Sequence, residues 1–217
     1  MKRRRGLIIG LEHRDIYHIE ETIRSISKFD KSIVFKIKPY QMLDFLFTDF
    51  KTFENPIIYD TKLADVGDYI NTEINRAINN KFAGIIVHGF MSNTVLQSIE
   101  KTKDSEVDVV VIADVTDKNS YYDKYYKEIA KDSAEFGANG IVAPATKPKR
   151  IKEIRKIIDE INDDIYILSP GIKYQGGSAK KALENGTDYL IVVRDIMEAK
   201  NPREKAEDYL DLISSYS

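Results

Sequence analysis

Short apolar runs rich in isoleucine and valine recur along the chain at nearly even spacing, and a longer segment of mixed polar and apolar residues follows each of them. Runs that are apolar at almost every position are typical of parallel strands, because both faces of such strands are buried. The pattern therefore predicts eight strands, at residues 7–12, 33–37, 56–62, 83–88, 107–114, 140–144, 165–170 and 189–194.

The segments between these runs carry apolar residues at spacings of three and four, as in Ile19, Ile23 and Ile26, which predicts helices with one buried face. The last helix is expected to follow Asn201, with Pro202 near its first position, and to end near residue 214. Eight strands alternating with eight helices in 217 residues predict an α/β fold, the closed (β/α)8 barrel, as a single domain over residues 1–217. An open doubly wound sheet is the alternative, but it more often has five or six strands.

The composition of the chain limits the kinds of partner that the protein is expected to bind. The chain has 33 basic and 35 acidic side chains and a formal net charge of -2, so it lacks the overall basic field that nucleic-acid binding normally needs. Its apolar runs are only a few residues long, far below the ~20 needed to span a bilayer, and the first of them is too short for a secretory signal. We therefore expect a cytoplasmic protein with neither a nucleic-acid nor a membrane partner.

The densest cluster of charge near a predicted strand end is Asp60-Thr61-Lys62-Leu63-Ala64-Asp65. Active sites of (β/α)8 barrels lie at the carboxyl ends of the strands. Because strand side chains alternate, Asp60 and Lys62 share a face, whereas Asp65 lies beyond the strand and can approach the same ammonium from another direction, including from another subunit. A lysine held between carboxylates stays protonated and suits a general acid that delivers a proton to a carbanion. The alternative is a salt bridge that ties the third strand to its helix.

Lys36, at the end of the second predicted strand, has two interpretations. It either extends from the barrel end as a structural residue or reaches Asp60 and lengthens the charge array. His88 is interpreted as a hydrogen-bonded structural residue. With three His, no Cys, no spacing that resembles a metal motif and no glycine-rich nucleotide motif, the sequence predicts neither a metal nor another cofactor.

A second cluster, SPGIKYQGGS at residues 169–178, is rich in glycine and precedes a predicted helix. Glycines let backbone N–H groups approach an anion, and a helix N-terminus adds a favourable dipole. Arg194 ends the eighth predicted strand, and barrel phosphate sites usually form from the loops after the seventh and eighth strands. The sequence therefore favours a phosphate site here over an ordinary turn with an arginine that caps the barrel.

Together these motifs resemble the orotidine 5'-monophosphate decarboxylases, in particular the short archaeal type, along essentially the whole chain. The segment 60–65 matches the D-x-K-x-x-D motif of that family, and Lys36 precedes it. IIVHGF at 85–90 and GIVAPATKP at 140–148 resemble the family's fourth and sixth strands, and SPGI followed by QGG resembles its phosphate loop. D-x-K-x-x-D alone is moderately specific, whereas all of these motifs in barrel order are highly specific.

The resemblance implies a homodimer without metal or cofactor that converts orotidine 5'-monophosphate to UMP and carbon dioxide in pyrimidine biosynthesis. Four residues are implied to be catalytic: Lys62 donates the proton to C6, Asp60 lies against the substrate carboxylate, Lys36 links Asp60 to the ribose, and Asp65 is contributed across the dimer interface. The implied substrate-binding residues are Glu12, Thr116, Pro170, Gly171, Gln175, Gly176, Gly177 and Arg194.

The chain departs from the family pattern mainly in the residues around the substrate. Glu12 stands where an aspartate usually contacts the ribose, and Thr116 stands where a serine reads the pyrimidine. The other departures are Lys38 and Val193 in place of glycines, Tyr69 in place of a threonine, and Lys173 and Tyr174 in place of a small pair. The residues of the proton-transfer array are all present.

Two alternatives remain open. Hexulose-phosphate synthases and keto-gulonate-phosphate decarboxylases of the same superfamily share D-x-K-x-x-D but carry a carboxylate, used with magnesium, where Lys36 stands. Lys36 and the QGG loop therefore favour the nucleotide decarboxylase. The other alternative is a non-catalytic barrel that binds a phosphate ligand, although a complete charge array would be costly to keep without a ligand.

Overall fold

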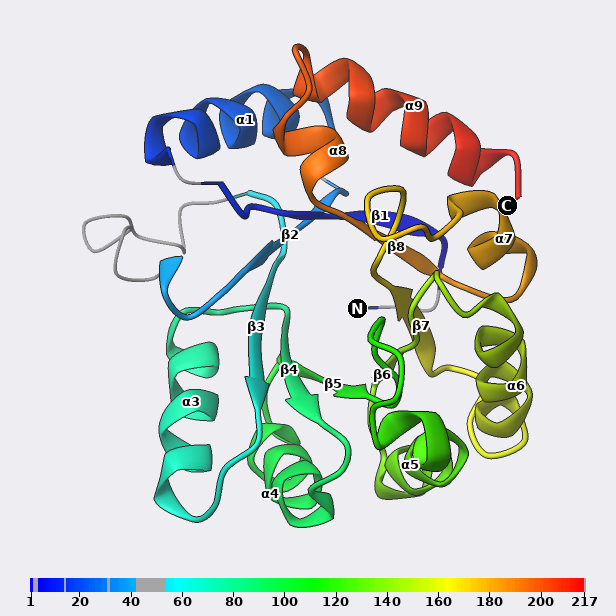
Figure 1. The fold of residues 1–217 in the computed structure, drawn as a ribbon. Helices are drawn as coiled ribbons and strands as arrows, with labels where there is room; N and C mark the ends of the chain where they lie inside the picture. The colour runs from blue at the N-terminus through cyan, green and yellow to red at the C-terminus, as the bar shows by residue number, and fades with distance from the viewer. Residues whose placement is uncertain (2–3, 14, 31, 42–53, 217) are drawn as a thin grey trace.

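The computed structural model describes residues 1, 4–13, 15–30, 32–41 and 54–216. Its eight strands are all parallel and close into a barrel in the order of the chain, from β1 next to β2 round to β8 next to β1. Helices surround the strands on the outside (Figure 1). This arrangement confirms the (β/α)8 barrel predicted from the sequence.

Strands and helices alternate as the apolar pattern indicates. The strands are β1 Gly6–Gly10, β2 Val34–Ile37, β3 Ile57–Leu63, β4 Gly84–His88, β5 Asp108–Ile112, β6 Gly140–Val142, β7 Tyr166–Ser169 and β8 Tyr189–Val192. The helices described are α1 Ile16–Phe29, α3 Asp68–Asn79, α4 Ser92–Thr102, α5 Tyr122–Phe136, α6 Pro148–Asp159, α7 Ala179–Glu184, α8 Arg194–Met197 and α9 Pro202–Ser214.

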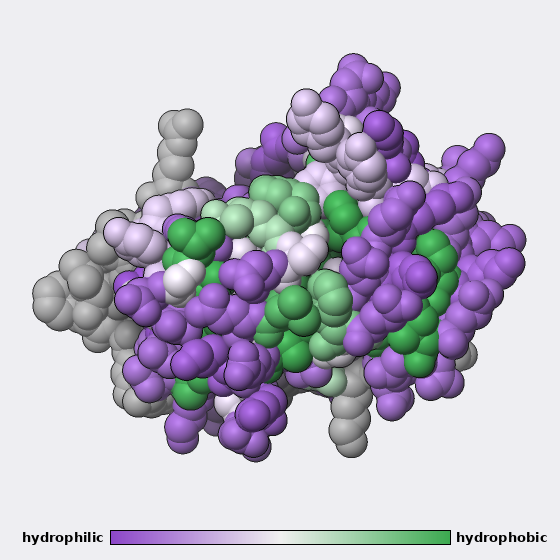
Figure 2. Space-filling model, turned by 90° about the horizontal axis from the view of Figure 1, so that it is seen from below, coloured by the Kyte–Doolittle hydropathy of each residue, from purple (hydrophilic) through white to green (hydrophobic). Residues whose placement is uncertain are grey.

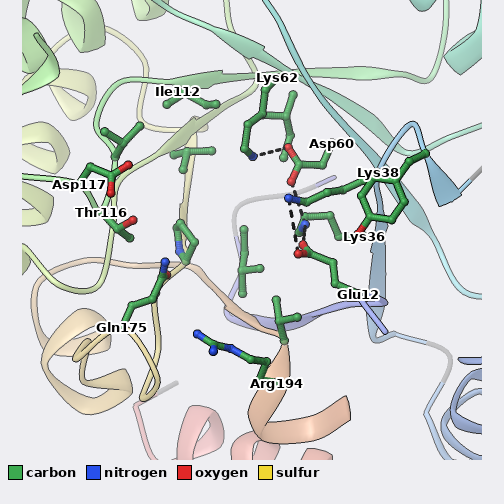
Figure 3. A pocket seen from close by; sticks show the side chains of 18 of the residues that line it. Glu12, Lys36, Lys38, Asp60, Lys62, Ile112, Thr116, Asp117, Gln175 and Arg194 are labelled. Carbon is green, nitrogen blue, oxygen red and sulfur yellow. Dashed lines mark hydrogen bonds and ion pairs between the residues drawn. The ribbon is translucent and has the colours of Figure 1, made fainter. Parts of the chain in front are cut away.

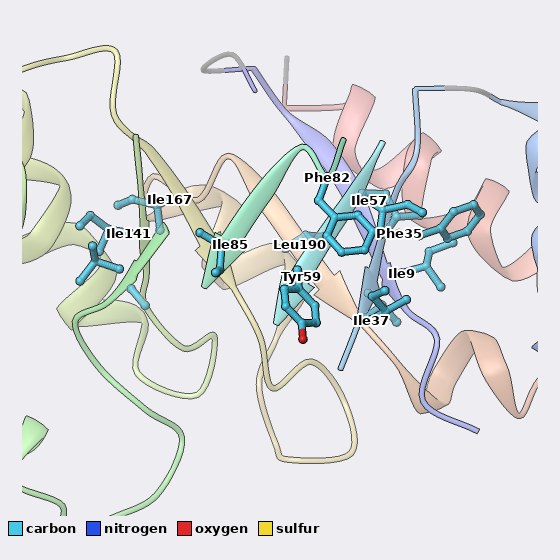
Figure 4. Packing of buried hydrophobic residues seen from close by; sticks show 14 of the residues in the cluster. Ile9, Phe35, Ile37, Ile57, Tyr59, Phe82, Ile85, Ile141, Ile167 and Leu190 are labelled. Carbon is cyan, nitrogen blue, oxygen red and sulfur yellow. The ribbon is translucent and has the colours of Figure 1, made fainter. Parts of the chain in front are cut away.

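Alternate residues of each strand pack into two different layers. Ile8 of β1 belongs to a cluster built almost entirely from the strands, with Val34 and Ile58 on the next two strands. Its neighbour Ile9 belongs to a larger cluster that also contains apolar residues of the helices, such as Ile23. Figure 4 shows part of this second layer. Both faces of the strands are therefore buried, as their continuous apolar runs predicted.

The ends of the helices follow from local sequence. The Asn201 side chain accepts a hydrogen bond from the Glu204 N–H, and Pro202 is the first residue of α9, as predicted. The Asp15 carboxylate caps α1 in the same way by accepting from the Tyr17 N–H.

The region after β8 differs from the prediction. The strand ends at Val192, and Arg194 begins the four-residue helix α8 instead of ending the strand. This short helix is stabilised because Met197 is fully buried and its carbonyl accepts a hydrogen bond from His18 Nε2 at 2.6 Å. Arg194 is therefore placed on a short helix beside the barrel mouth.

The surface over α3, α4 and α5 is largely hydrophilic, and its hydrophobic side chains lie in separate patches between polar ones (Figure 2). None of the helices in the described ranges has both the length and the apolar character that crossing a bilayer requires.

Candidate active site

A cavity of about 1140 Å³ lies at the carboxyl ends of the strands. Its apolar lining is formed by Ile86, Ile112, Val142 and Ile191, and charged or polar side chains lie around them. Nine of the residues predicted from the sequence line it: Glu12, Lys36, Asp60, Lys62, Thr116, Pro170, Gly171, Gln175 and Arg194. In Figure 3 Glu12, Lys36, Asp60 and Lys62, from the ends of the first three strands or just beyond them, lie on one side of the cavity, and Gln175 and Arg194 lie on the other.

The charged side of the cavity is a continuous chain of ion pairs. Lys36 Nζ donates to Glu12 Oε1 at 2.7 Å and to Asp60 Oδ2 at 2.8 Å. Lys62 Nζ donates to the other oxygen of Asp60 at 2.7 Å (Figure 3). Lys36 therefore does reach Asp60, which was one of its two interpretations, and Asp60 lies between two ammonium groups.

Burial separates the roles available to these groups. Lys36 and Asp60 are each only 4% exposed, whereas the Lys62 side chain is 47% exposed. A molecule in the cavity therefore has the widest access to Lys62, although Lys36 and Asp60 also line the cavity.

The pKa values of the array follow from its geometry. Burial works to raise the pKa of Asp60, but Lys36 and Lys62 outweigh it and lower that pKa to about 2. Burial works to lower the pKa of Lys36, but the carboxylates of Asp60 and Glu12 raise it above the usual value. For Lys62 burial is the largest effect, and it lowers the pKa in spite of Asp60. Lys62 is thus the lysine of this pair whose ammonium gives up its proton more easily.

The backbone at Lys62 is unusual for a strand. Its φ is +49°, in a region that side-chain-bearing residues seldom adopt, and the register between β3 and β4 shifts between Tyr59 and Leu63. The Thr61 hydroxyl stabilises this irregularity because it donates to the Ile86 carbonyl at 2.8 Å and accepts from the Leu63 N–H at 3.2 Å. Such a conformation costs roughly 1–3 kcal/mol, and residues of this kind cluster at functional sites.

Asp65 is not part of the array within one chain. Residues 64–69 are all exposed, and Asp65 Oδ1 accepts a hydrogen bond from the Val66 N–H at 2.8 Å. Asp65 is not one of the described residues that line the cavity. Its approach to Lys62 from a second subunit stays a prediction.

The loop between β7 and α7 forms part of the opposite side. Gly177 must be glycine because a Cβ there would lie 2.4 Å from the Gly171 carbonyl oxygen. The Gly177 N–H donates to that same oxygen at 3.0 Å, and the Gly176 N–H donates to the Lys173 carbonyl at 2.9 Å. These two amides stabilise the loop, while Gln175 and Arg194 line the cavity.

Four charged groups hold the loop after β5, which carries Thr116. Their spacing in the sequence does not predict that they pair. Asp114 is fully buried and receives Lys147 Nζ at 2.9 Å and an Arg150 nitrogen at 3.1 Å. The same two cations contact Asp123 Oδ1 at 2.8 and 2.6 Å, and their hydrogen bonds hold the pKa of Asp123 well below its usual value.

Other residues of the cavity lining lie outside the predicted site, and Lys38 and His88 are two of them. Lys38 Nζ is 3.5 Å from Glu12 Oε2, so it adds one more cation to the array. Its place in the sequence, where the family has a glycine, was the available signal. His88 Nδ1 and the Tyr122 hydroxyl share a hydrogen bond of 2.6 Å, which agrees with a structural interpretation of His88, although its side chain also lines the cavity.

Within the described ranges, no group of three or more His, Cys, Asp and Glu residues is arranged to hold a metal ion.

Comparisons with known proteins agree with this geometry. A family model described as the orotidine 5'-phosphate decarboxylase / HUMPS family matches residues 7–209. The chain is 37% identical over 161 residues to the orotidine 5'-phosphate decarboxylase of Methanococcoides burtonii, which covers 72% of this chain and 73% of the relative. It is 36% identical over 164 residues to that of Pyrococcus abyssi, with 72% and 73% covered.

Solved structures show the same fold. The orotidine 5'-monophosphate decarboxylase of Methanocaldococcus jannaschii complexed with the inhibitor BMP has a TM-score of 0.82 at 22% identity, and the match covers 97% of this chain and 99% of that one. The enzyme of Pyrococcus horikoshii OT3 has a TM-score of 0.81 at 25% identity, with 96% and 99% covered.

Proposed function

The chain belongs to the orotidine 5'-phosphate decarboxylase / HUMPS family, and from this membership and the site we propose that it converts orotidine 5'-monophosphate to UMP and carbon dioxide with Lys62 as the proton donor. The observation that carries the proposal is the position of Asp60, which lies between Lys36 and Lys62 at the cavity. In this proposal the reaction is a carboxy-lyase step of pyrimidine biosynthesis, carried out by one barrel domain over residues 1–217.

Lys62 has the properties that the chemical step needs. Loss of carbon dioxide leaves an electron pair on C6, and an ammonium beside that carbon stabilises the negative charge and then donates its proton to it. The lowered pKa of Lys62 favours this transfer. The neutral amine that remains then regains a proton from water.

Asp60 and Lys36 prepare the site for that step. A pKa of about 2 keeps Asp60 ionised beside Lys62, in the place where the substrate carboxylate would lie. Lys36 and Glu12 lie on the far side of Asp60, where their polar groups would contact the ribose. The array is held by the fold before substrate binds, so little reorganisation is needed during the reaction.

The remaining sequence assignments complete the proposal. Gln175 and Arg194 bind the phosphate, and the loop that contains Pro170, Gly171, Gly176 and Gly177 shapes this part of the cavity. Thr116 contacts the pyrimidine from the loop after β5.

A homodimer supplies Asp65 from its second subunit. The exposed segment 64–69 supports this part, because it includes Val66 and Tyr69, which are 59% and 70% exposed, beside Asp65. The location in the cytoplasm stays a prediction, which fractionation of the source cells tests.

A spectrophotometric assay tests the proposed function. Purified protein in a buffer with EDTA should consume orotidine 5'-monophosphate. The loss of absorbance by the orotate ring measures this consumption. Parallel reactions with hexulose and keto-gulonate phosphates plus magnesium test the other enzymes of the superfamily. A folded, dimeric protein that leaves orotidine 5'-monophosphate intact contradicts the proposal.

A further inference from the structure

The arginine proposed to bind phosphate lies against an aromatic ring from a different loop. The Arg194 guanidinium carbon lies over the ring of Tyr174, 4.6 Å from its centroid. Tyr174 is on the loop between β7 and α7, where the family has a small residue, and it is 50% exposed. Among the described residues, no carboxylate forms an ion pair with Arg194. The contact with Tyr174 is therefore the main interaction that fixes its charged group before a ligand binds.

Contacts with other elements hold α8, the helix that carries Arg194, in place. His18 holds the Met197 carbonyl of α8, and Met197 is fully buried. The Tyr209 hydroxyl donates to Asp195 Oδ2 at 2.8 Å, so α9 holds α8 from outside. Lys173, the residue before Tyr174, forms an ion pair with Asp195.

Tyr174 itself makes a second contact with this region. Its hydroxyl donates to Glu198 Oε2 at 3.2 Å, one residue beyond the end of α8. The loop is thus attached to α8 through the Lys173 pair and through the Tyr174 hydrogen bond, and the Tyr174 ring lies against Arg194 between them. The following residue, Gln175, lines the cavity together with Arg194.

This geometry suits a guanidinium that must meet a phosphate. An arginine that stacks by its flat face on an aromatic ring keeps its N–H groups free at the edge, where they can form two parallel hydrogen bonds with an oxyanion. The N–H groups of Gly176 and Gly177 are already used inside the loop, so the phosphate depends on side chains such as Arg194 more than the loop sequence alone suggests. Holding Arg194 in place before binding reduces the entropy that it loses on binding.

We infer that Tyr174 is a positioning residue that orients Arg194 toward the ligand's phosphate and thereby sets the preference of the site for a phosphorylated nucleotide. The inference rests on the proposed function only in that it takes the ligand to be a nucleoside monophosphate. Tyr174 acts through its ring, and the hydroxyl contact with Glu198 is secondary.

The test compares UMP and uridine binding by isothermal titration calorimetry in the parent protein and in Tyr174→Ala, Tyr174→Phe, Arg194→Ala and the double variant Tyr174→Ala/Arg194→Ala. Tyr174→Ala should weaken UMP binding by roughly three- to tenfold, the range expected for a lost cation–π contact. The ratio of UMP affinity to uridine affinity should fall by the same factor. Tyr174→Phe, which keeps the ring, should restore UMP affinity to within about twofold of the parent. In the Arg194→Ala background the Tyr174→Ala change should have no further effect.

Three results would overturn the inference. The first is equal UMP affinity in Tyr174→Ala and the parent, and the second is a loss of uridine affinity as large as the loss of UMP affinity. The third is a loss of UMP affinity on Tyr174→Ala that is as large in the Arg194→Ala background as in the parent. Circular dichroism checks that each variant is folded. Because Tyr174 is half-exposed, we expect its replacement to leave the fold intact. Turnover of orotidine 5'-monophosphate by the parent is measured separately. An inactive parent contradicts the proposed function, whereas an active parent with no Tyr174 effect contradicts this inference alone.

Discussion

Asp60→Asn replaces the carboxylate between Lys36 and Lys62 with an amide of nearly the same shape. The pKa of Asp60 is lowered from 3.8 to about 2, so the folded protein prefers the ionised form by about 2 kcal/mol relative to the unfolded chain. Breaking a buried ion pair usually costs about 3–5 kcal/mol, but Lys36 keeps Glu12 as a partner at 2.7 Å. We therefore expect the free energy of unfolding at pH 7 to fall by about 2 kcal/mol in the variant.

The difference between parent and variant should depend on pH in a defined direction. Because the pKa of Asp60 is depressed in the folded state, its contribution is fully present well above pH 3.8 and is lost as the pH falls toward about 2. The stability difference should therefore be the same at pH 7 and pH 5 and should shrink to about half at pH 3. Urea unfolding followed by far-ultraviolet circular dichroism at these three values measures it.

Asp65→Asn is the matched control, because it changes the other carboxylate of the same motif. The Asp65 side chain is exposed, and its Oδ1 accepts a hydrogen bond from the Val66 N–H, which an asparagine oxygen can also accept. Its stability should change by less than about 0.5 kcal/mol. Equal stability of the Asp60→Asn variant and the parent, or a difference that is still undiminished at pH 3, would contradict a stabilising role for the ionised Asp60 carboxylate.

Three other predictions concern turnover and the loop after β5. Lys62→Ala should abolish consumption of orotidine 5'-monophosphate in the absorbance assay while circular dichroism stays that of the parent, and turnover near the parental rate would exclude Lys62 as the proton donor. Asp65→Asn should reduce activity, and mixing it with Lys62→Ala protein should restore some, because a hybrid dimer rebuilds one complete site; no recovery despite demonstrated subunit exchange argues against a shared site. Lys147→Met removes one of the two cations that contact the fully buried Asp114, so it should raise KM several-fold and destabilise the fold by about 1–3 kcal/mol in urea unfolding. Its control, Lys127→Met, removes an exposed ion pair with a carboxylate and should change the stability by less than about 1 kcal/mol; equal effects of the two variants would contradict a special role for Lys147.

The sequence predicted the barrel well because the signal for it is local. Each strand needs only a short apolar run, and the alternation seen at Ile8 and Ile9 places such runs between two buried layers. The charge array could also be predicted from the sequence, because Asp60 and Lys62 are two residues apart on one strand and Lys36 is the second-last residue of the strand beside it.

Other parts of the site depend on pairings between residues that are distant in the chain. Lys147 meets Asp114 only because the barrel places the loops after β5 and β6 next to each other. The contact of the Arg194 guanidinium with the Tyr174 ring depends on α8, a four-residue helix without a clear sequence signature. Spacing in the sequence therefore predicts which residues lie at the barrel mouth, but the fold decides which of them contact one another.

Product analysis tests the central claim most directly. Orotidine 5'-monophosphate is incubated with the purified protein in deuterated water containing EDTA, and the mixture is followed by proton nuclear magnetic resonance. UMP should accumulate with deuterium at C6, because the Lys62 ammonium exchanges with solvent before it donates to that carbon, and the Lys62→Ala variant should form none. Unchanged orotidine 5'-monophosphate in the presence of folded, dimeric protein, or equal formation of UMP by the variant, would contradict this claim.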